Sequence, residues 1–199
     1  AVSMEAHGPY EPGRYAEPRI GIEAELDEAG AGELGSYVES IHHADRELGA
    51  LIDAFEKLDR PLVLVFFGDH RPNLPLTYRQ LGVTNAQGRV EGDLRQRTEP
   101  YAVPMVAWSR GVALPEALGT MSAAYFGSLL LELTGTPGTP YTDFLRAARA
   151  QAPIVLPWVM MNGAGEPLRE TMAELEADWW TLQYDALFGE AWQAGAGGG

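Results

Sequence analysis

The chain has 199 residues, which fits one domain, with two possible, and its 46% of hydrophobic residues can build a sizeable core. Its formal net charge of −14 argues against nucleic acid and against an anionic membrane surface as partners, because both require a basic face. The absence of cysteine excludes disulfides and thiolate chemistry. An acidic chain can still bind an anionic substrate where a metal or an arginine makes the site locally positive.

The first third of the sequence predicts a short strand, a loop and a long helix. Residues 1–6 are expected to form the strand, and residues 7–35 a turn-rich and acidic loop. From Ser36 onward, apolar residues recur at spacings of three and four, which is the period of an amphipathic helix. Ser36 and Glu39 have the spacing of a capping box, so we expect the helix to begin there and to stop before Pro61.

Residues 62–67, Leu-Val-Leu-Val-Phe-Phe, are continuously apolar, β-branched or aromatic. Such a run is typical of a strand that is buried on both faces of a parallel sheet covered by helices. Residues 103–109 are expected to form another strand, and residues 152–161 a strand interrupted at Pro157. The sequence therefore predicts an α/β fold in which helices flank a mostly parallel sheet.

Three further helical segments are expected in the C-terminal half, at residues 122–135, 141–150 and 168–192, the last as one helix or a helix pair. The last of them is rich in aromatic side chains, namely Trp179, Trp180, Tyr184, Phe188 and Trp192. Because Tyr184 and Phe188 are four residues apart and share a helix face, we predict that these aromatic residues belong to the core.

Polar side chains directly follow the apolar strand at 62–67. Asp69 and His70 stand just past its carboxyl end, where ligands bind in open α/β sheets. A turn through Gly68 and before Pro72 would bring both side chains to one point, and a carboxylate with an imidazole suits Mn, Zn or Fe better than Ca. The spacing alone leaves an alternative open, in which Asp69 caps a loop and His70 packs nearby.

Other charged residues are weaker candidates. His7 follows the first expected strand and opens a tight turn, although a lone histidine is more often structural. Arg71 can bind an anion bidentately or pair with an acid, and the acidic composition favours the second. His42 and His43 do not share a helix face, so we expect His42 to pack at the edge of the helix and His43 to be solvated.

Residues 4–10 (Met-Glu-Ala-His-Gly-Pro-Tyr) and residues 37–75, which end in Gly-Asp-His-Arg-Pro-Asn-Leu-Pro, carry a family resemblance. Together they resemble the sulfatase-like enzymes of the alkaline phosphatase superfamily, in the branch of lipoteichoic acid synthases and bacterial phosphoglycerol transferases. The similarity continues through residues 103–109, 122–145 and 182–189, so it extends over nearly the whole chain. The most specific part is Gly-Asp-His-x-Pro after a buried strand.

This resemblance implies an alkaline-phosphatase-like fold and a set of site residues. Asp69 and His70 match the metal ligands of the family's Gly-Asp-His motif. His7 matches the histidine that contacts the phosphate or head group of the substrate. Arg71 stands where many relatives have an apolar residue, so it inherits no role. The implied cofactor is a divalent metal, with Mn preferred and Zn or Mg as alternatives.

The family's nucleophile, which is a Thr, a Ser or a modified Cys, has no match in this chain, and neither does a further acidic metal ligand. The resemblance implies that both lie upstream. Residues 1–192 would then be the C-terminal part of a sulfatase-like catalytic domain, with a flexible tail at 193–199. We accordingly expect no catalytic residue here and no activity of the isolated chain. The parent enzyme would be membrane-anchored and act at the extracytoplasmic (periplasmic) face of the cytoplasmic membrane.

The function implied by the resemblance is transfer of a phosphoglycerol-type group to a glycan or lipid acceptor, with a phospholipid or a glycan as substrate. One alternative is a hydrolase of the same fold that acts on sulfate or phosphate esters. A Thr nucleophile would favour the transferase, and a modified Cys the sulfatase. Another alternative is a non-catalytic binding domain that has kept the fold. No oligomeric state is implied.

Overall fold

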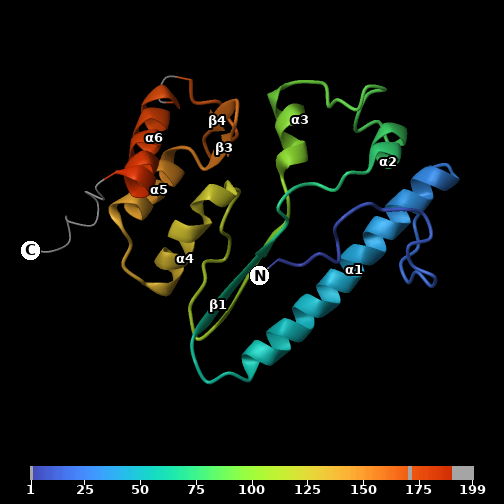
Figure 1. The fold of residues 1–199 in the computed structure, drawn as a ribbon, viewed down its shortest axis with the longest axis horizontal. Coiled ribbons are helices and arrows are strands. Elements are labelled where there is room, and N and C mark those ends of the chain that lie inside the picture. Colours follow the sequence, from blue (N-terminus) through green and yellow to red (C-terminus); the bar gives the residue numbers. More distant parts are fainter. Residues whose placement is uncertain (1, 170–171, 190–199) are drawn as a thin grey trace, which may run out of the picture. The chain divides into compact units, whose positions relative to one another are not determined.

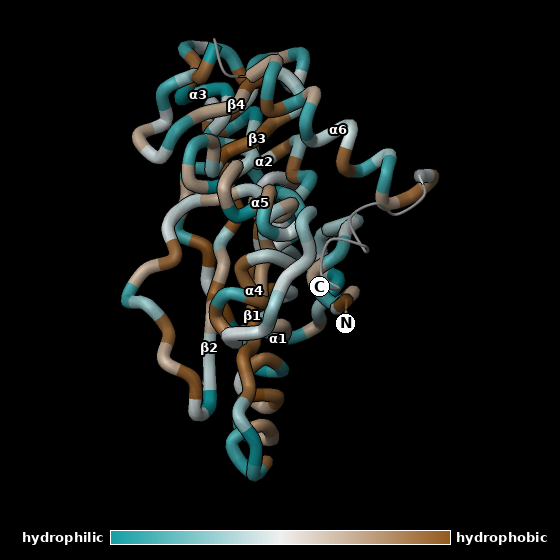
Figure 2. The backbone as a smooth tube through the Cα atoms, turned by 90° about the vertical axis from the view of Figure 1, so that its left-hand side faces the viewer, coloured by the Kyte–Doolittle hydropathy of each residue, from teal (hydrophilic) through white to brown (hydrophobic). Residues whose placement is uncertain are grey.

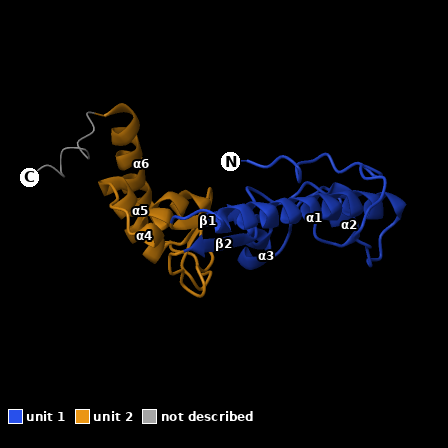
Figure 3. Cartoon of the chain, turned by 90° about the horizontal axis from the view of Figure 1, so that it is seen from below, with its two compact units in different colours: residues 1–60, 64–110 blue, residues 61–63, 111–199 orange. Residues whose placement is uncertain are grey.

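The computed structural model describes residues 2–169 and 172–189. The chain divides into two compact units, of which the first comprises residues 1–60 and 64–110 and the second residues 61–63 and 111–199 (Figure 3). The chain contains both helices and strands, as expected for the α/β class (Figure 1). Among the described helices, none is both long and apolar enough to cross a bilayer.

The long helix of the first unit, α1, spans Glu28–Glu56 and therefore begins earlier than predicted. Its N-cap is Asp27, whose carboxylate accepts the backbone N–H of Gly30 at 2.8 Å. Ser36 lies inside the helix, where its hydroxyl donates to the carbonyl of Glu11 at 2.6 Å. The capping box expected at Ser36 is therefore wrong, because an acidic N-cap earlier in the chain starts the helix.

The buried face of α1 is polar. Its buried residues are Gly30, Glu33, Ser36, Glu39 and Ser40. By contrast, two residues of the predicted apolar stripe, Ile41 and Leu51, are 43% and 41% exposed. The segments that lie on this face present backbone N–H and carbonyl groups, which have to be hydrogen-bonded when they are buried. Polar side chains of α1 meet that need.

The strand predicted from the apolar run is present as β1, Leu62–Phe67, and it pairs with β2, Met105–Arg110. The N–H of Gly68, just past β1, donates to the carbonyl of Pro104, just before β2, at 3.3 Å. Arg110, at the end of β2, reaches back to Asp59 ahead of β1, with 3.9 Å between the charged atoms. Each strand thus ends beside the start of the other, which is an antiparallel arrangement.

Two features of the first unit differ from the sequence prediction. Residues 2–6 form no strand; the N–H of His7 instead closes a turn onto the carbonyl of Met4 at 3.1 Å. Without that strand there is no parallel crossover through α1. β1 is also less buried than its sequence suggests, since Phe66 and Phe67 are 38% and 40% exposed. In a two-stranded sheet each strand has a neighbour on one edge only.

The connection from β1 to β2 contains two short helices that the sequence did not predict. They are α2, Pro75–Gln80, and α3, Leu94–Thr98, and the 3-10 turn η1, Glu99–Tyr101, follows them. α3 begins with a capping box, in which Asp93 accepts the N–H of Gln96 and the Gln96 side chain accepts the N–H of Asp93. Helices of this length are too short to show a hydrophobic period.

The elements of the second unit agree better with the prediction. They are η2 (Ala123–Tyr125), α4 (Phe126–Thr134), α5 (Pro140–Gln151), β3 (Ile154–Leu156), β4 (Val159–Met161) and α6 (Met172–Phe188). Gly135 ends α4 in the left-handed conformation, with φ of 64°, which glycine adopts without a steric penalty. β3 and β4 form an antiparallel hairpin that turns at Pro157, with Val155 opposite Met160.

The core of the second unit is built around Tyr125, Leu145 and Ala148. α6 contributes Trp179 to this core, and its indole N–H donates to the Tyr141 hydroxyl at 3.1 Å. The other described aromatic residues of α6 do not belong to the core: Trp180, Tyr184 and Phe188 are 72%, 64% and 74% exposed. Placing them in the core is therefore wrong, because Trp179 and Leu175 are the described α6 residues that pack against it. Along α6, hydrophobic and hydrophilic residues are interspersed (Figure 2). Trp192 and the predicted tail lie outside the described residues.

Candidate functional site

His7 lies on an exposed turn of the N-terminal loop. Its Nδ1 is 2.7 Å from the carbonyl oxygen of Gly8. Since a carbonyl only accepts, Nδ1 carries the proton and the lone pair of Nε2 is left free. The segment from Met4 to Arg14 lines an open pocket of about 520 Å³ around this turn. The turn therefore presents an imidazole nitrogen at a hollow that a small ligand can enter.

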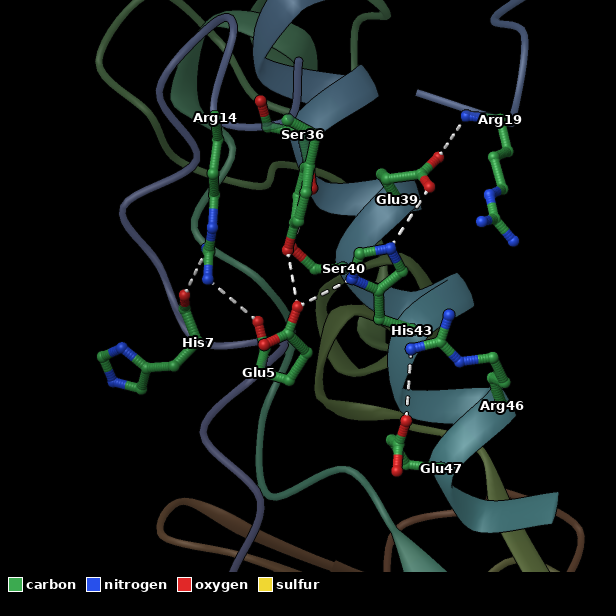
Figure 4. Close-up of polar contacts among 11 residues, drawn as sticks. Glu5, His7, Arg14, Arg19, Ser36, Glu39, Ser40, His43, Arg46 and Glu47 are labelled. Atoms are coloured by element: carbon green, nitrogen blue, oxygen red, sulfur yellow. Dashed lines mark hydrogen bonds and ion pairs between the residues drawn. The ribbon is translucent and has the colours of Figure 1, made fainter. Parts of the chain in front are cut away.

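Arg14 holds the backbone of the His7 turn. Its two terminal nitrogens donate to the carbonyls of His7 at 2.9 Å and Glu5 at 3.1 Å. The imidazole of His7 points away from this guanidinium (Figure 4). Arg14 thus fixes the main chain on both sides of Ala6 while it leaves the His7 ring unobstructed.

His43 fastens the N-terminal loop to α1. Its Nδ1 lies 3.0 Å from Oε1 of Glu5, and its Nε2 lies 3.4 Å from Oε1 of Glu39 (Figure 4). Glu39 is buried and also accepts the backbone N–H groups of Arg19 at 2.8 Å and Ile20 at 3.3 Å. The side chain of His43 is only 26% exposed, so the prediction of a solvated His43 is wrong. The carboxylate of Glu5, in the N-terminal loop, covers the face of α1 that the helical periodicity of the sequence predicts to face solvent.

The two carboxyl groups that contact His43, those of Glu5 and Glu39, have lowered pKa values. The hydrogen bond from His43 lowers the pKa of Glu5, and the N–H of Arg19 lowers the pKa of Glu39. A carboxyl whose pKa is lower in the folded than in the unfolded chain stabilises the folded state. This stabilisation is fully present at a pH above the pKa of the unfolded chain. That stability is lost as the pH falls through the folded value.

We therefore expect the N-terminal loop to loosen from α1 as the pH drops below 4.5, the ordinary pKa of a Glu carboxyl. Hydrogen exchange at the amides of Arg19 and Ile20, compared with that of an α5 amide, measures the change. In the Glu39→Gln variant the acid dependence at these amides should be weaker. Exchange that does not respond to acid in the unmodified chain would contradict the assignment.

Asp69 and His70 lie on the turn that follows β1. The backbone N–H of His70 donates to Oδ1 of Asp69 at 2.9 Å, and Nδ1 of His70 donates to the carbonyl of Arg71 at 2.8 Å. Nε2 of His70 is consequently free, and it lies 3.6 Å from Oδ2 of Asp69. Both side chains are open to solvent, at 82% for Asp69 and 67% for His70.

This arrangement fits two ligands of one metal ion. Metal bonds of about 2.0–2.2 Å at a tetrahedral angle place two ligand atoms roughly 3.4 Å apart. A metal-binding histidine usually donates its other ring N–H to a carbonyl or carboxylate, as His70 does to Arg71. Within residues 2–169 and 172–189, no group of three or more His, Cys, Asp or Glu side chains is placed to hold a metal. In this part of the chain, Asp69 and His70 would therefore offer at most two ligands to a metal.

Tyr10, which follows the His7 turn, is buried against a tyrosine of α1. Tyr10 is 8% exposed and packs edge-on against Tyr37 of α1, with ring centroids 5.3 Å apart. Its hydroxyl donates to the carbonyl of Ala6 at 2.7 Å. Burial raises the pKa of Tyr10, and the negative charge of Asp69 raises it further. Tyr10 is thus hydrogen-bonded to the His7 turn through Ala6.

Arg71 does not pair with an acid. Its guanidinium carbon lies 5.2 Å from the ring centroid of Tyr78, a residue of α2. Burial raises the pKa of Tyr78, while the charge of Arg71 acts in the opposite direction. Throughout the described residues, the Arg71 side chain forms no ion pair and no hydrogen bond, and its Nη1 atom is buried without a partner. The expectation that Arg71 pairs with a carboxylate is thus contradicted.

Comparison with curated proteins finds two relatives in Rhizobium meliloti (strain 1021). The chain is 29% identical over 196 residues to a protein named as a candidate cyclic beta-1,2-glucan modification protein, which covers 96% of this chain and 31% of that protein. It is 38% identical over 73 residues to the capsular polysaccharide biosynthesis protein RkpI, which covers 37% of this chain and 11% of that protein. The chain spans at most about a third of these relatives.

Among solved structures, the chain resembles the Streptococcus pyogenes phosphoglycerol transferase GacH in complex with sn-glycerol-1-phosphate. The TM-score is 0.57 at 19% sequence identity, over 82% of this chain and 37% of that chain. This likeness supports the alkaline-phosphatase-like α/β fold expected from the sequence. The sequence profile of the Sulfatase family matches residues 1–136, which include the His7 turn, β1 and the Asp69–His70 pair. With more than half of its length matched in this way, the chain belongs to the Sulfatase family.

Proposed function

We propose that this chain supplies part of the active site of an extracytoplasmic, metal-dependent transferase that moves a phosphoglycerol-type group to a glycan or lipid acceptor. The observation that carries the proposal is the approach of Asp69 Oδ2 and His70 Nε2 to 3.6 Å on the turn after β1, in a chain of the Sulfatase family. The similarity to a solved phosphoglycerol transferase supports the assignment of a phosphoglycerol-type group as the group transferred. The relative named for glucan modification supports a glycan acceptor.

In this proposal, Asp69 and His70 hold a divalent metal, for which we favour Mn, with Zn or Mg as alternatives. The metal, when bound, supplies positive charge that neutralises phosphoryl oxygens and favours deprotonation of an attacking hydroxyl. The hydrogen bond from Nδ1 of His70 to the carbonyl of Arg71 keeps Nε2 directed at the ion.

His7 would contact the substrate through its free Nε2. In the neutral ring this atom accepts a hydrogen bond, so it can bind a hydroxyl of a glycerol or sugar group. In the protonated ring it donates, so it can bind a phosphate oxygen. The two bonds from Arg14 to the backbone keep the turn in place without contacting the ring. A small phosphorylated polyol presents both kinds of partner.

The attacking group of the transferase is proposed to come from outside these residues. Three buried hydroxyls of the first unit are engaged in structural bonds: Ser36 donates to Glu11, Ser40 to Ser36, and Thr77 to Glu33. Residues 1–192 would then be part of a catalytic domain in a membrane-anchored parent enzyme. A hydrolase of the same fold is the second candidate, supported by the Sulfatase profile, and water would be its acceptor.

Removing the two metal ligands is the test of the proposed function. We expect the unmodified chain to bind Mn²⁺ weakly, with Kd above about a micromolar, because two protein ligands leave most coordination positions to water. Paramagnetic broadening of His70 ring signals by Mn²⁺ should be strong in the unmodified chain. In an Asp69→Asn, His70→Gln variant, calorimetric Mn²⁺ binding should weaken at least about tenfold.

A matched control removes the same two groups elsewhere on the chain. The Asp53→Asn, His42→Gln variant changes α1 and should leave Mn²⁺ affinity and the broadening of His70 unchanged. Broadening that spares His70, or Mn²⁺ binding that survives the loss of both Asp69 and His70, would refute the metal site. Binding tighter than about a micromolar would mean that this chain contains further ligands.

A further inference from the structure

Arg71 directly follows the Asp69–His70 pair, and among the residues that the structure describes its guanidinium has no partner of opposite charge. The chain has 28 acidic residues against 14 basic ones, and some of its arginines pair with carboxylates. Arg110 pairs with Asp59, Arg146 with Asp143, and Arg149 with Glu132. Arg71 forms no such pair among the described residues and its Nη1 atom is buried, so its charge is available to bind an anion from outside.

The guanidinium of Arg71 is nevertheless held in place. It lies over the ring of Tyr78, with 5.2 Å from its central carbon to the ring centroid. The hydroxyl of Tyr78 donates to the carbonyl of Pro72 at 2.9 Å, which ties that ring to the residue next to Arg71. A cation over an aromatic face gains electrostatic attraction and loses little of its hydrogen-bonding capacity, because the donors lie in the guanidinium plane.

Part of this cation is also shielded from water. Nη1 of Arg71 is buried and has no hydrogen-bond partner among the residues that the structure describes. Partial removal of water from a charged donor costs free energy, which an anionic partner at the remaining N–H groups offsets. The planar fork of arginine matches two oxygens of a phosphate, whereas a lysine offers a single point charge.

The backbone of Arg71 takes part in the same turn as the metal ligands. Its carbonyl accepts the Nδ1–H of His70 at 2.8 Å, and this bond directs Nε2 of His70 toward Asp69. The side chain of Arg71 therefore leaves the chain one residue after His70, from a peptide whose carbonyl is fixed. A metal at Asp69 and His70 and the guanidinium of Arg71 would then be two positive groups carried by consecutive residues of one turn.

We propose that Arg71 is a specificity-determining residue that binds the phosphate of the substrate beside the metal ligands Asp69 and His70. The ligand class is a phosphate ester of a small polyol, bound through two phosphate oxygens in the plane of the guanidinium. This inference rests on the proposed function, since it assigns the anion-binding partner of the same site. It also explains how a chain of net charge −14 attracts an anionic substrate.

The test is a calorimetric titration of the full 199-residue chain with sn-glycerol-1-phosphate in the presence of Mn²⁺ and at low ionic strength. Arg71→Met keeps a long side chain over Tyr78 but removes the charge and all donors, so we expect affinity to fall about tenfold or more. Arg71→Lys keeps the charge without the fork and should give an intermediate loss. Thermal unfolding should show that both variants remain folded.

Arg79→Met is the matched control, because Arg79 is an exposed arginine of α2 and its replacement makes the same change in net charge. We expect its affinity to stay within about twofold of the unmodified chain, since surface charges are screened by salt. Equal losses in the Arg71→Met and Arg79→Met variants would overturn the proposal. So would a folded Arg71→Met variant that binds as tightly as the unmodified chain, or an unmodified chain that binds no phosphate ester.

The failure of this inference can be told apart from the failure of the proposed function. If only the Asp69→Asn, His70→Gln variant loses phosphate-ester affinity, the metal site stands and Arg71 has no part in binding. If only Arg71→Met loses affinity, Arg71 binds the phosphate and the metal-dependent function is refuted. Losses in both variants, with the Arg79→Met control unchanged, are the result we expect.

Discussion

Replacing Tyr125 with alanine is expected to lower the free energy of unfolding of the second unit by about 3–5 kcal/mol. Tyr125 is fully buried and packs against Leu145 and Ala148. Removing its ring leaves a cavity that this small core cannot close, and it leaves the carbonyl of Ala152 without the hydroxyl that donates to it at 2.8 Å. Urea unfolding followed by near-UV circular dichroism would measure the loss.

The Tyr125→Phe variant separates the ring from the hydroxyl. It keeps the packing and loses one buried hydrogen bond, so we expect a cost of about 1 kcal/mol. Burial raises the pKa of Tyr125 to about 12, which keeps the hydroxyl a protonated donor at neutral pH. If the phenylalanine and alanine variants lose the same stability, the ring is not the centre of this core.

Replacing Glu33 with alanine is expected to cost the first unit about 3 kcal/mol, because hydrogen bonds to buried charged groups are strong. Glu33 is 7% exposed and accepts both the backbone N–H and the hydroxyl of Thr77, each at 2.9 Å. Without this carboxylate the N–H of Thr77 is buried and unpaired. Faster hydrogen exchange at Thr77, together with a lower urea midpoint, would show that α2 has been released from α1.

Glu47 provides the control for Glu33, since it belongs to the same helix and its side chain is 69% exposed. We expect Glu47→Ala to change stability by no more than about 0.5 kcal/mol. An unchanged exchange rate at Thr77 in the Glu33→Ala variant would contradict the assigned role. Because Tyr78 directly follows Thr77, the same release should disturb the ring on which Arg71 rests.

The elements that the sequence predicted well are those with a strong local pattern. β1 has six consecutive apolar residues, and Gly135 supplies the left-handed residue that ends α4. The start of α1 was missed because Asp27 lies in an acidic stretch that also fits a solvated loop. The polar burial of α1 could not be predicted either, since it depends on loop groups that reach the helix only in the folded chain.

In the candidate site, too, some features could be predicted from the sequence and others depend on the folded structure. Asp69 and His70 are adjacent in sequence, so their position past an apolar strand was visible without a structure. The contacts of His43 could not be predicted from the sequence, because its partner Glu5 lies 38 residues away along the chain. The lack of an acid beside Arg71 is a tertiary property as well. Composition favoured a carboxylate partner, and only the fold shows that none is in reach among the described residues.

The polar face of α1 also sets the angle at which this helix can sit. An apolar contact tolerates sliding and repacking, whereas a hydrogen bond is directional. Ser36 and Glu39 each bond backbone groups of the N-terminal loop, and Glu33 bonds Thr77. A shift of one residue would turn the helix by about 100° and break all three. These bonds therefore fix the rotation of α1 about its own axis. The same rotation sets the position of His43, which contacts Glu5, and so the orientation of the turn that bears His7.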